Sequence, residues 1–192
     1  MDFDQIYLAH RTWLLDTIPA VPQEVAAAFA ACCAERLYPA LPRFERKCNA
    51  APRPNVSVLR QGLDAVWDAT SGFTRSTSVI SPQGSACKAA IPTETQCAAA
   101  AEAAAEDAGA AIAYAVMALE TNGTAYAAWA GVRGLDALDA VRSEDVAESC
   151  AVLLREIERQ RRDLLVLQRA FGRGLLAAEV QAARSRAVAE AS

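Results

Sequence analysis

The sequence has few of the residues that build most reactive sites. It contains a single histidine, His10, and none of its six cysteines forms a Cys-x-x-Cys pair, so the common ligand sets for zinc are missing. No glycine-rich loop follows a strand pattern, as it does where a chain holds nucleotide phosphates. We therefore expect no catalytic residue, no metal site and no cofactor.

Positive charge, strand signals and uninterrupted apolar runs are also scarce. The net charge is −4 and the pI is about 5.1, which argues against a nucleic-acid-binding protein, because such proteins usually present a basic face. Runs of β-branched residues are nearly absent, which disfavours strands. The most apolar segment, residues 98–119, includes Glu102, Glu106 and Asp107, so we expect no membrane-spanning helix.

The chain does not begin like a secreted protein. Acidic residues stand where a secretory signal would carry a basic stretch and an apolar core. We therefore expect a cytoplasmic protein whose thiols are reduced and buried, since a disulfide scaffold is normally shorter and richer in loops. The cysteines are Cys32, Cys33, Cys48, Cys87, Cys97 and Cys150.

Alanine dominates what is present, with 45 of 192 residues. Alanine is the best helix former, because it loses no side-chain entropy on ordering. The apolar spacing and the proline and glycine positions predict an all-α protein, a compact antiparallel bundle of about seven helices in one domain, 1–192. The expected helices span residues 3–17, 22–38, 55–71, 93–120, 124–141, 143–171 and 174–189, with one more helical turn around Phe44.

Three further features qualify this prediction. Residues 73–91 are rich in Ser, Thr, Gly and Pro and are expected to form a long surface loop. The last helix, 174–189, has a polar face and is expected at the periphery. In 143–171, apolar residues recur at steps of four and three, a pattern that packs inside a bundle or pairs with another chain. These positions are 146, 150, 153, 157, 160, 164, 167 and 171, and only Gln160 among them is polar.

Several short motifs resemble the YjaG-like family of bacterial proteins, a domain family of unknown function numbered 416. The resemblance rests on Phe29-Ala30-Ala31, on Glu35-Arg36-Leu37 with Pro39 and Phe44, on Leu59-x3-Leu63-Asp64-x2-Trp67, on Ile91-Pro92, on Glu106-Asp107-Ala108, and on Glu156-x3-Gln160-x2-Asp163-Leu164-Leu165. It implies a compact helical fold and no particular activity. The alanine-rich helices and the Arg/Ala-rich end depart from the family, so this would be a divergent member.

A small set of polar residues is the best candidate for partner contacts or a pocket. Arg60 and Asp64 share one face of a helix with Asp68, and paired carboxylates can bind a divalent ion if Glu106 and Asp107 on another helix complete the set. Ordinary salt bridges explain the same spacing, and Arg36 at a helix end suits the last carbonyls. The candidate residues are Glu35, Arg36, Arg43, Arg60, Asp64, Trp67 and Asp107.

Three functions fit these observations. The first is a non-enzymatic protein-binding module, for example an immunity or antitoxin-type protein whose acidic surface blocks a basic toxin. The second is a homodimeric helical scaffold that uses the 146–171 seam. The third is a metal-dependent enzyme built on helix carboxylates. We rank protein binding first, with a protein partner, and expect neither a nucleic-acid nor a membrane partner.

Overall fold

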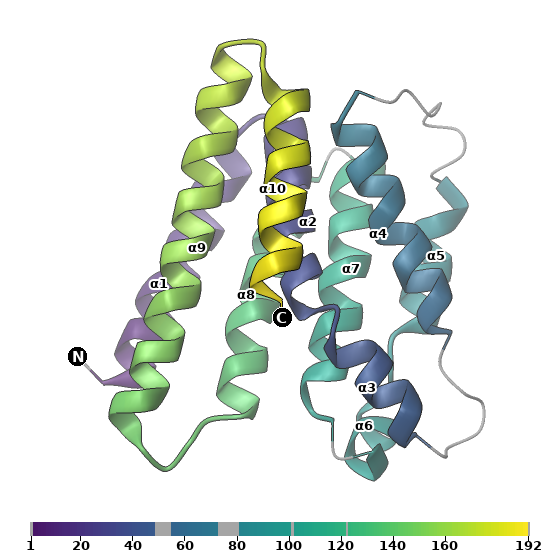
Figure 1. The fold of residues 1–192 in the computed structure, drawn as a ribbon, viewed down its shortest axis with the longest axis vertical. Helices are drawn as coiled ribbons and strands as arrows, with labels where there is room; N and C mark the ends of the chain where they lie inside the picture. The colour runs from purple at the N-terminus through teal and green to yellow at the C-terminus, as the bar shows by residue number, and fades with distance from the viewer. Residues whose placement is uncertain (1, 49–54, 73–80, 101, 122, 192) are drawn as a thin grey trace.

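The computed structural model describes residues 2–48, 55–72, 81–100, 102–121 and 123–191, and these residues form helices joined by short connections (Figure 1). No strand occurs in these ranges, so the all-α prediction is confirmed. The helices are α1 (Phe3–Thr17), the 3-10 turn η1 (Ile18–Ala20), α2 (Gln23–Leu37), α3 (Ala40–Lys47), α4 (Val56–Thr70), α5 (Ser81–Ala90), α6 (Glu94–Ala100), α7 (Ala104–Glu120), α8 (Thr124–Ala140), α9 (Val146–Gly172) and α10 (Leu176–Glu190).

Side-chain caps explain where several helices begin. Asp2 and Gln5 form a reciprocal capping box at the start of α1, and the Asn55 side chain accepts from the amide of Val58 at the start of α4. At the start of α9 the cap is Asp145, which accepts from two backbone amides. The sequence also offers Ser143, where the expected helix 143–171 begins, as a cap. Asp145 replaces it because the helix begins two residues later.

Helix α2 is the centre of the bundle. Its residues are buried without a break from Val25 to Arg36, and it contacts α4, α7, α8, α9 and α10. A helix that is apolar on all sides belongs in an interior. Its alanines let neighbouring backbones approach closely, and this explains why so much of the chain is alanine.

The prediction of a long loop at 73–91 is wrong for its second half. Residues 81–90 form α5, which packs on α4 and α7, whereas 73–80 lie outside the described residues. Cys87 on α5 is fully buried, so burial of one face stabilises a helix that its Ser, Pro and Gly content does not favour.

The expected helix 93–120 is two helices, α6 and α7, and the short turn near Phe44 is the full helix α3. Together with α5, these changes raise the count from about seven to ten α-helices in the described residues. The last helix, α10, is part of the bundle: it packs on α2, α4 and α9 and buries Val180, Ala183 and Ala187. No helix among the described residues is long and apolar enough to cross a membrane.

The predicted apolar seam of α9 faces inward along its middle. Leu153, Ile157, Gln160, Leu164 and Leu167 are all buried, and α9 packs on α1, α2, α8 and α10. Figure 1 shows α9 along one edge of the molecule, with α1 behind it and α10 beside it. The inward seam is therefore not available for pairing with a second chain.

Candidate functional site

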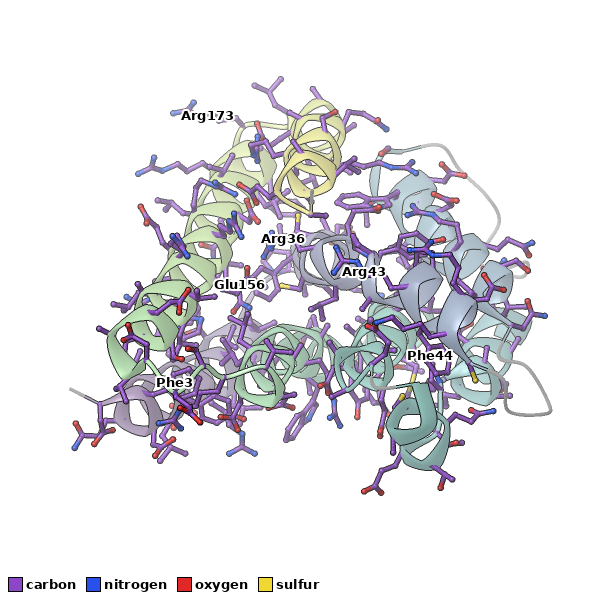
Figure 2. The ribbon with its side chains drawn as sticks, turned by 60° about the horizontal axis from the view of Figure 1, so that its bottom comes forward. Phe3, Arg36, Arg43, Phe44, Glu156 and Arg173 are labelled. Carbon is purple, nitrogen blue, oxygen red and sulfur yellow. The ribbon has the colours of Figure 1, made fainter. Side chains whose placement is uncertain are left out.

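Arg36 is the centre of a buried ionic cluster between α2 and α9. Its guanidinium donates to Oε1 of Glu156 from Nη2 at 2.9 Å and from Nε at 3.2 Å, and to Oδ2 of Asp163 from Nη1 at 2.7 Å. Figure 2 shows Arg36 and Glu156 together between the two helices, and Arg173 well away at the end of α9. The Arg36 side chain is 4% exposed. Burial alone would lower its pKa, but Glu156 and Asp163 hold the pKa above its usual value.

Helix α10 closes this cluster with Glu190. Its carboxylate lies 2.8 Å from Nη1 of Arg162 and 3.7 Å from Nη1 of Arg36. Burial would raise the pKa of Glu190, but the hydrogen bond and charge of Arg162 lower it. Arg162 also donates to Asp163 at 2.9 Å. The carboxylates of the cluster are therefore neutralised by arginines of the same chain, which suits a structural clamp among three helices.

A chain of hydrogen bonds links this cluster to α1. The Gln160 amide donates to the carbonyl of Gly131 and to Oε1 of Glu156, both at 3.1 Å, so its oxygen is the acceptor for Nε2 of His10 at 3.0 Å. Burial lowers the pKa of His10 to about 4, and the ring is therefore neutral at pH 7. Its Nδ1 has no hydrogen-bond partner.

A second cluster gathers around Glu35 on the other side of α2. Arg60 donates to both Glu35 oxygens, at 2.6 and 3.1 Å, and to Asp64 at 2.5 Å. The indole of Trp67 donates to Oε2 of Glu35 at 2.8 Å, and Arg184 of α10 pairs with Asp64. Burial would raise the pKa of Asp64, but the two arginines lower it. Each carboxylate of this cluster is therefore occupied by a cation or an N–H donor.

A third cluster joins α7 and α8. Arg133 donates to Asp107 at 3.0 Å and lies 3.4 Å from Asp136, and the Tyr7 hydroxyl donates to Asp136 at 2.5 Å. Burial raises the pKa of Asp107 to about 6, although Arg133 opposes the shift. Through Tyr7, this arrangement links α1 to α8 and, through Arg133, to α7.

The structure brings four of the seven candidate residues into one cluster, and these are Glu35, Arg60, Asp64 and Trp67. The other three, Arg36, Arg43 and Asp107, lie elsewhere. Glu35 and Arg36 are consecutive but belong to different clusters, and the expectation that Arg36 meets helix carbonyls is wrong. Asp64 and Asp107 do not share a site. Within the described ranges, no group of three or more His, Cys, Asp and Glu side chains is placed to hold a metal ion. Arg43 is exposed, whereas Trp67 is fully buried.

The thiols have the environment expected for core residues. All six are unpaired, and all except Cys150 are buried. Burial raises the pKa of Cys32 and Cys33 well above the usual value, and of Cys87 and Cys97 to about 11. Because the thiolate is the nucleophile, these four are unreactive at neutral pH.

The outward face of α9 has a different character. Eight exposed residues recur along it at steps of four and three, and we call them the α9 outer stripe. Leu154 and Leu165 in the stripe are 50% and 46% exposed. The members are Ala147, Ala151, Leu154, Glu158, Arg161, Leu165, Gln168 and Gly172.

Two hollows open along this stripe. One is a shallow, open depression on α9 alone, from Leu154 to Leu165. The other, of about 470 Å³, lies between α1 and α9, where Ile6 and Ala9 face Leu154 and Ile157. Arg161 lines both, and its guanidinium lies 5.2 Å from the ring centre of Trp13. The face thus offers two exposed leucines on either side of a charged centre, Glu158 and Arg161. Surfaces that bind a helix use anchors with this spacing.

Sequence reasoning missed this face, although the signal was present. The stripe repeats the four-and-three spacing of the buried seam one residue later along the chain, but Glu158 and Arg161 interrupt its apolar character. A search for apolar repeats therefore finds the seam and passes over the stripe. No family model, curated protein or solved structure matches this chain, so the resemblance to the YjaG-like family stays a prediction.

Proposed function

We propose that this protein is a non-enzymatic protein-binding module and that its binding surface is the α9 outer stripe with the hollow toward α1. The observation that supports this most is the exposure of Leu154 and Leu165 on one helix face. Leu154 adjoins the apolar hollow lined by Ile6, Ala9 and Ile157, and an exposed apolar patch of this kind commonly marks an interaction surface.

The three charged clusters support the same assignment, because their groups are already bound to one another and are not free to bind a partner. The carboxylates around Arg36 and Arg60 are satisfied by arginines, and the described cysteines with raised pKa values are poor nucleophiles. These groups stabilise helix packing. The residues left for contact with another molecule are those on the surface, and the α9 outer stripe carries two of the exposed large apolar side chains, Leu154 and Leu165.

The chemistry of the stripe favours a helical partner. A helix laid along α9 would place apolar side chains against Leu154 and Leu165, and polar side chains of both signs against Glu158 and Arg161. Helix-in-groove binding is read by anchors spaced three and four residues apart, which is the spacing of the stripe. The partner is thus an amphipathic helix with acidic and basic residues near its centre.

Site-directed photocrosslinking in native lysate tests the proposal. A photoreactive amino acid replaces Leu165 in one variant and Ala89, an exposed residue of α5, in the control. We expect a discrete crosslinked product from position 165, attached to one helical segment of one protein, and none from position 89. Adding Arg161→Glu to the first variant should abolish that product.

Identical products from both positions, or no product from position 165, would contradict the proposal. Mass spectrometry of the product also separates two kinds of partner, because it distinguishes a second copy of this chain from a different protein.

An immunity or antitoxin-type inhibitor is a second candidate, and a different surface favours it. Glu94, Glu102 and Glu106 line a hollow of about 450 Å³ beside Cys97 and Val141. Lys47 pairs with Glu102, which leaves two carboxylates to attract a basic partner. In this case the partner should be lost at high salt and from the double variant Glu94→Gln and Glu106→Gln, and retained by Leu154→Asp.

A further inference from the structure

The α9 outer stripe is complementary to itself. A two-fold axis placed between residues 159 and 160 carries each stripe position onto another one in an antiparallel copy of the helix. Leu154 then faces Leu165, and Glu158 faces Arg161. Toward the two ends, Ala151 faces Gln168 and Ala147 faces Gly172. Large apolar side chains meet each other, opposite charges meet each other, and the outermost pair is small.

This pairing also fits the geometry of helix packing. Steps of four and three residues keep one face of a helix toward its partner over many turns. Symmetric dimers use the same patch twice, so residue i contacts residue j and j contacts i. In α9 the pairs of Leu154 with Leu165 and of Glu158 with Arg161 both satisfy this condition, each occurring twice about the axis.

The two central charged residues of the stripe, Glu158 and Arg161, are accessible for such a contact. Arg161 is exposed, yet its guanidinium is held over Trp13 by a cation–π contact at 5.2 Å, which reduces the entropy lost when it binds a carboxylate. Glu158 is exposed, and none of the ion pairs within the described part of the chain includes it. Each copy thus contributes one oriented cation and one available carboxylate.

The residues flanking the stripe are compatible with the pairing. The same axis brings Glu148 at one end of α9 alongside Arg169 at the other end of the second helix, which adds an attractive contact. Arg155 faces Arg162 of the second copy, but Arg162 is already bound by Glu190 at 2.8 Å and by Asp163 at 2.9 Å. Its charge is therefore largely neutralised within its own chain.

We propose that the occupant of the α9 outer stripe is the α9 outer stripe of a second copy, in an antiparallel two-fold dimer. This inference rests on the proposed function, since it names the partner of the same surface. A single helix pair buries less than the roughly 800 Å² per partner of a typical stable complex. The dimer is therefore reversible, and its population depends on protein concentration.

The first test is sedimentation equilibrium of the full chain from micromolar to millimolar concentration. We expect a monomer–dimer equilibrium for the natural sequence. The single variants Glu158→Arg and Arg161→Glu place like charges opposite each other at two symmetric contacts, and each should raise the dissociation constant at least about tenfold. Ala89→Arg on α5 adds a charge away from α9 and should leave the constant unchanged.

The decisive measurement mixes the two charge variants. In a mixed dimer, the arginine introduced at position 158 of one chain meets the glutamate introduced at position 161 of the other. The second contact keeps the natural Glu158 opposite the natural Arg161. Both contacts are attractive again, so the mixture should dimerise as tightly as the natural sequence. If each variant alone is monomeric and the mixture is too, the central contact is wrong and the proposal fails.

Direction is tested with cysteine variants. Leu154→Cys mixed with Leu165→Cys should form an intermolecular disulfide under mild oxidation, and Leu154→Cys alone should form far less, because residue 154 of one helix lies opposite residue 165 of the other. The reverse result would indicate a parallel pair and overturn the proposal.

The dimer and the binding function can be rejected separately. A strict monomer at millimolar concentration rejects the second copy as the partner. If photocrosslinking at position 165 then identifies a different protein, the binding function stands with another helix on the stripe. If it identifies nothing, both proposals fail.

Discussion

Leu153 and Leu154 are consecutive residues of α9 with opposite environments. Leu153 is fully buried among α9 and its neighbours, whereas Leu154 is 50% exposed on the outer stripe. A rotation of about 100° per residue separates them on the helix. The pair therefore distinguishes the face of α9 that stabilises the fold from the face that is available for binding.

Leu153→Asp should unfold the protein, and Leu154→Asp should leave it folded. A carboxylate at position 153 replaces packed atoms with a charge that has no partner, at a cost of at least about 4 kcal/mol. At position 154 the free energy of unfolding should change by no more than about 0.5 kcal/mol. Urea denaturation followed by circular dichroism measures both. Unfolding of both variants would mean that the stripe belongs to the core.

Arg36→Met should be strongly destabilising at pH 7. The substitution leaves Glu156 and Asp163 buried without their cation, which typically costs about 3–5 kcal/mol. Urea denaturation at pH 7 measures this cost. Arg43→Met, at an exposed position, is the matched control and should have little effect. Equal effects at the two positions would contradict the clamp among α2, α9 and α10.

His10 should make the protein sensitive to mild acid. Burial lowers its folded pKa to about 4 from 6.5, so between these values the unfolded chain binds the proton and the folded one does not. Stability is therefore lost as the pH falls through this window, by about 2 kcal/mol at pH 5. His10→Gln keeps an N–H donor and does not titrate. Its unfolding free energy should fall less between pH 7 and pH 5 than that of the natural sequence.

The thiols should react in two groups. Cys150 is half-buried and the other five are buried, so a thiol reagent at neutral pH should modify Cys150 first in the folded protein. Cys32 and Cys33, whose pKa values are raised by burial, should react only after unfolding. Peptide mapping after a short exposure identifies the modified residues, and early modification of Cys32 would contradict the buried environment.

Local sequence patterns predicted the all-α fold class well, but they did not predict the number of helices or all of their limits. The limits of α1 follow from Asp2 and from Pro19 beyond its end, and Asn55 marks the start of α4 correctly. The break between α6 and α7 falls in a run of alanine and glutamate, where no helix-breaking residue signals it. Helix α5 forms because Cys87 packs into the core, and composition alone does not contain that contact.

The site was less predictable because its contacts are remote in sequence. Arg36 meets Glu156 and Asp163 across more than a hundred residues, whereas spacing arguments detect partners three or four residues away, such as Arg60 and Asp64. The four-and-three spacing of the α9 outer stripe is present in the sequence. Distinguishing it from the adjacent seam required knowing which face the bundle covers.

Because α2 lies at the centre of the bundle, its backbone is exposed to solvent only when the protein unfolds globally. Every helix that packs on it must move before its backbone amides meet water, so no local fluctuation exposes Val25 to Arg36. Amide hydrogens in this segment should exchange with solvent at the rate set by global unfolding, the slowest in the molecule. The middle of α2 therefore provides an internal gauge of total stability, independent of the surface that binds.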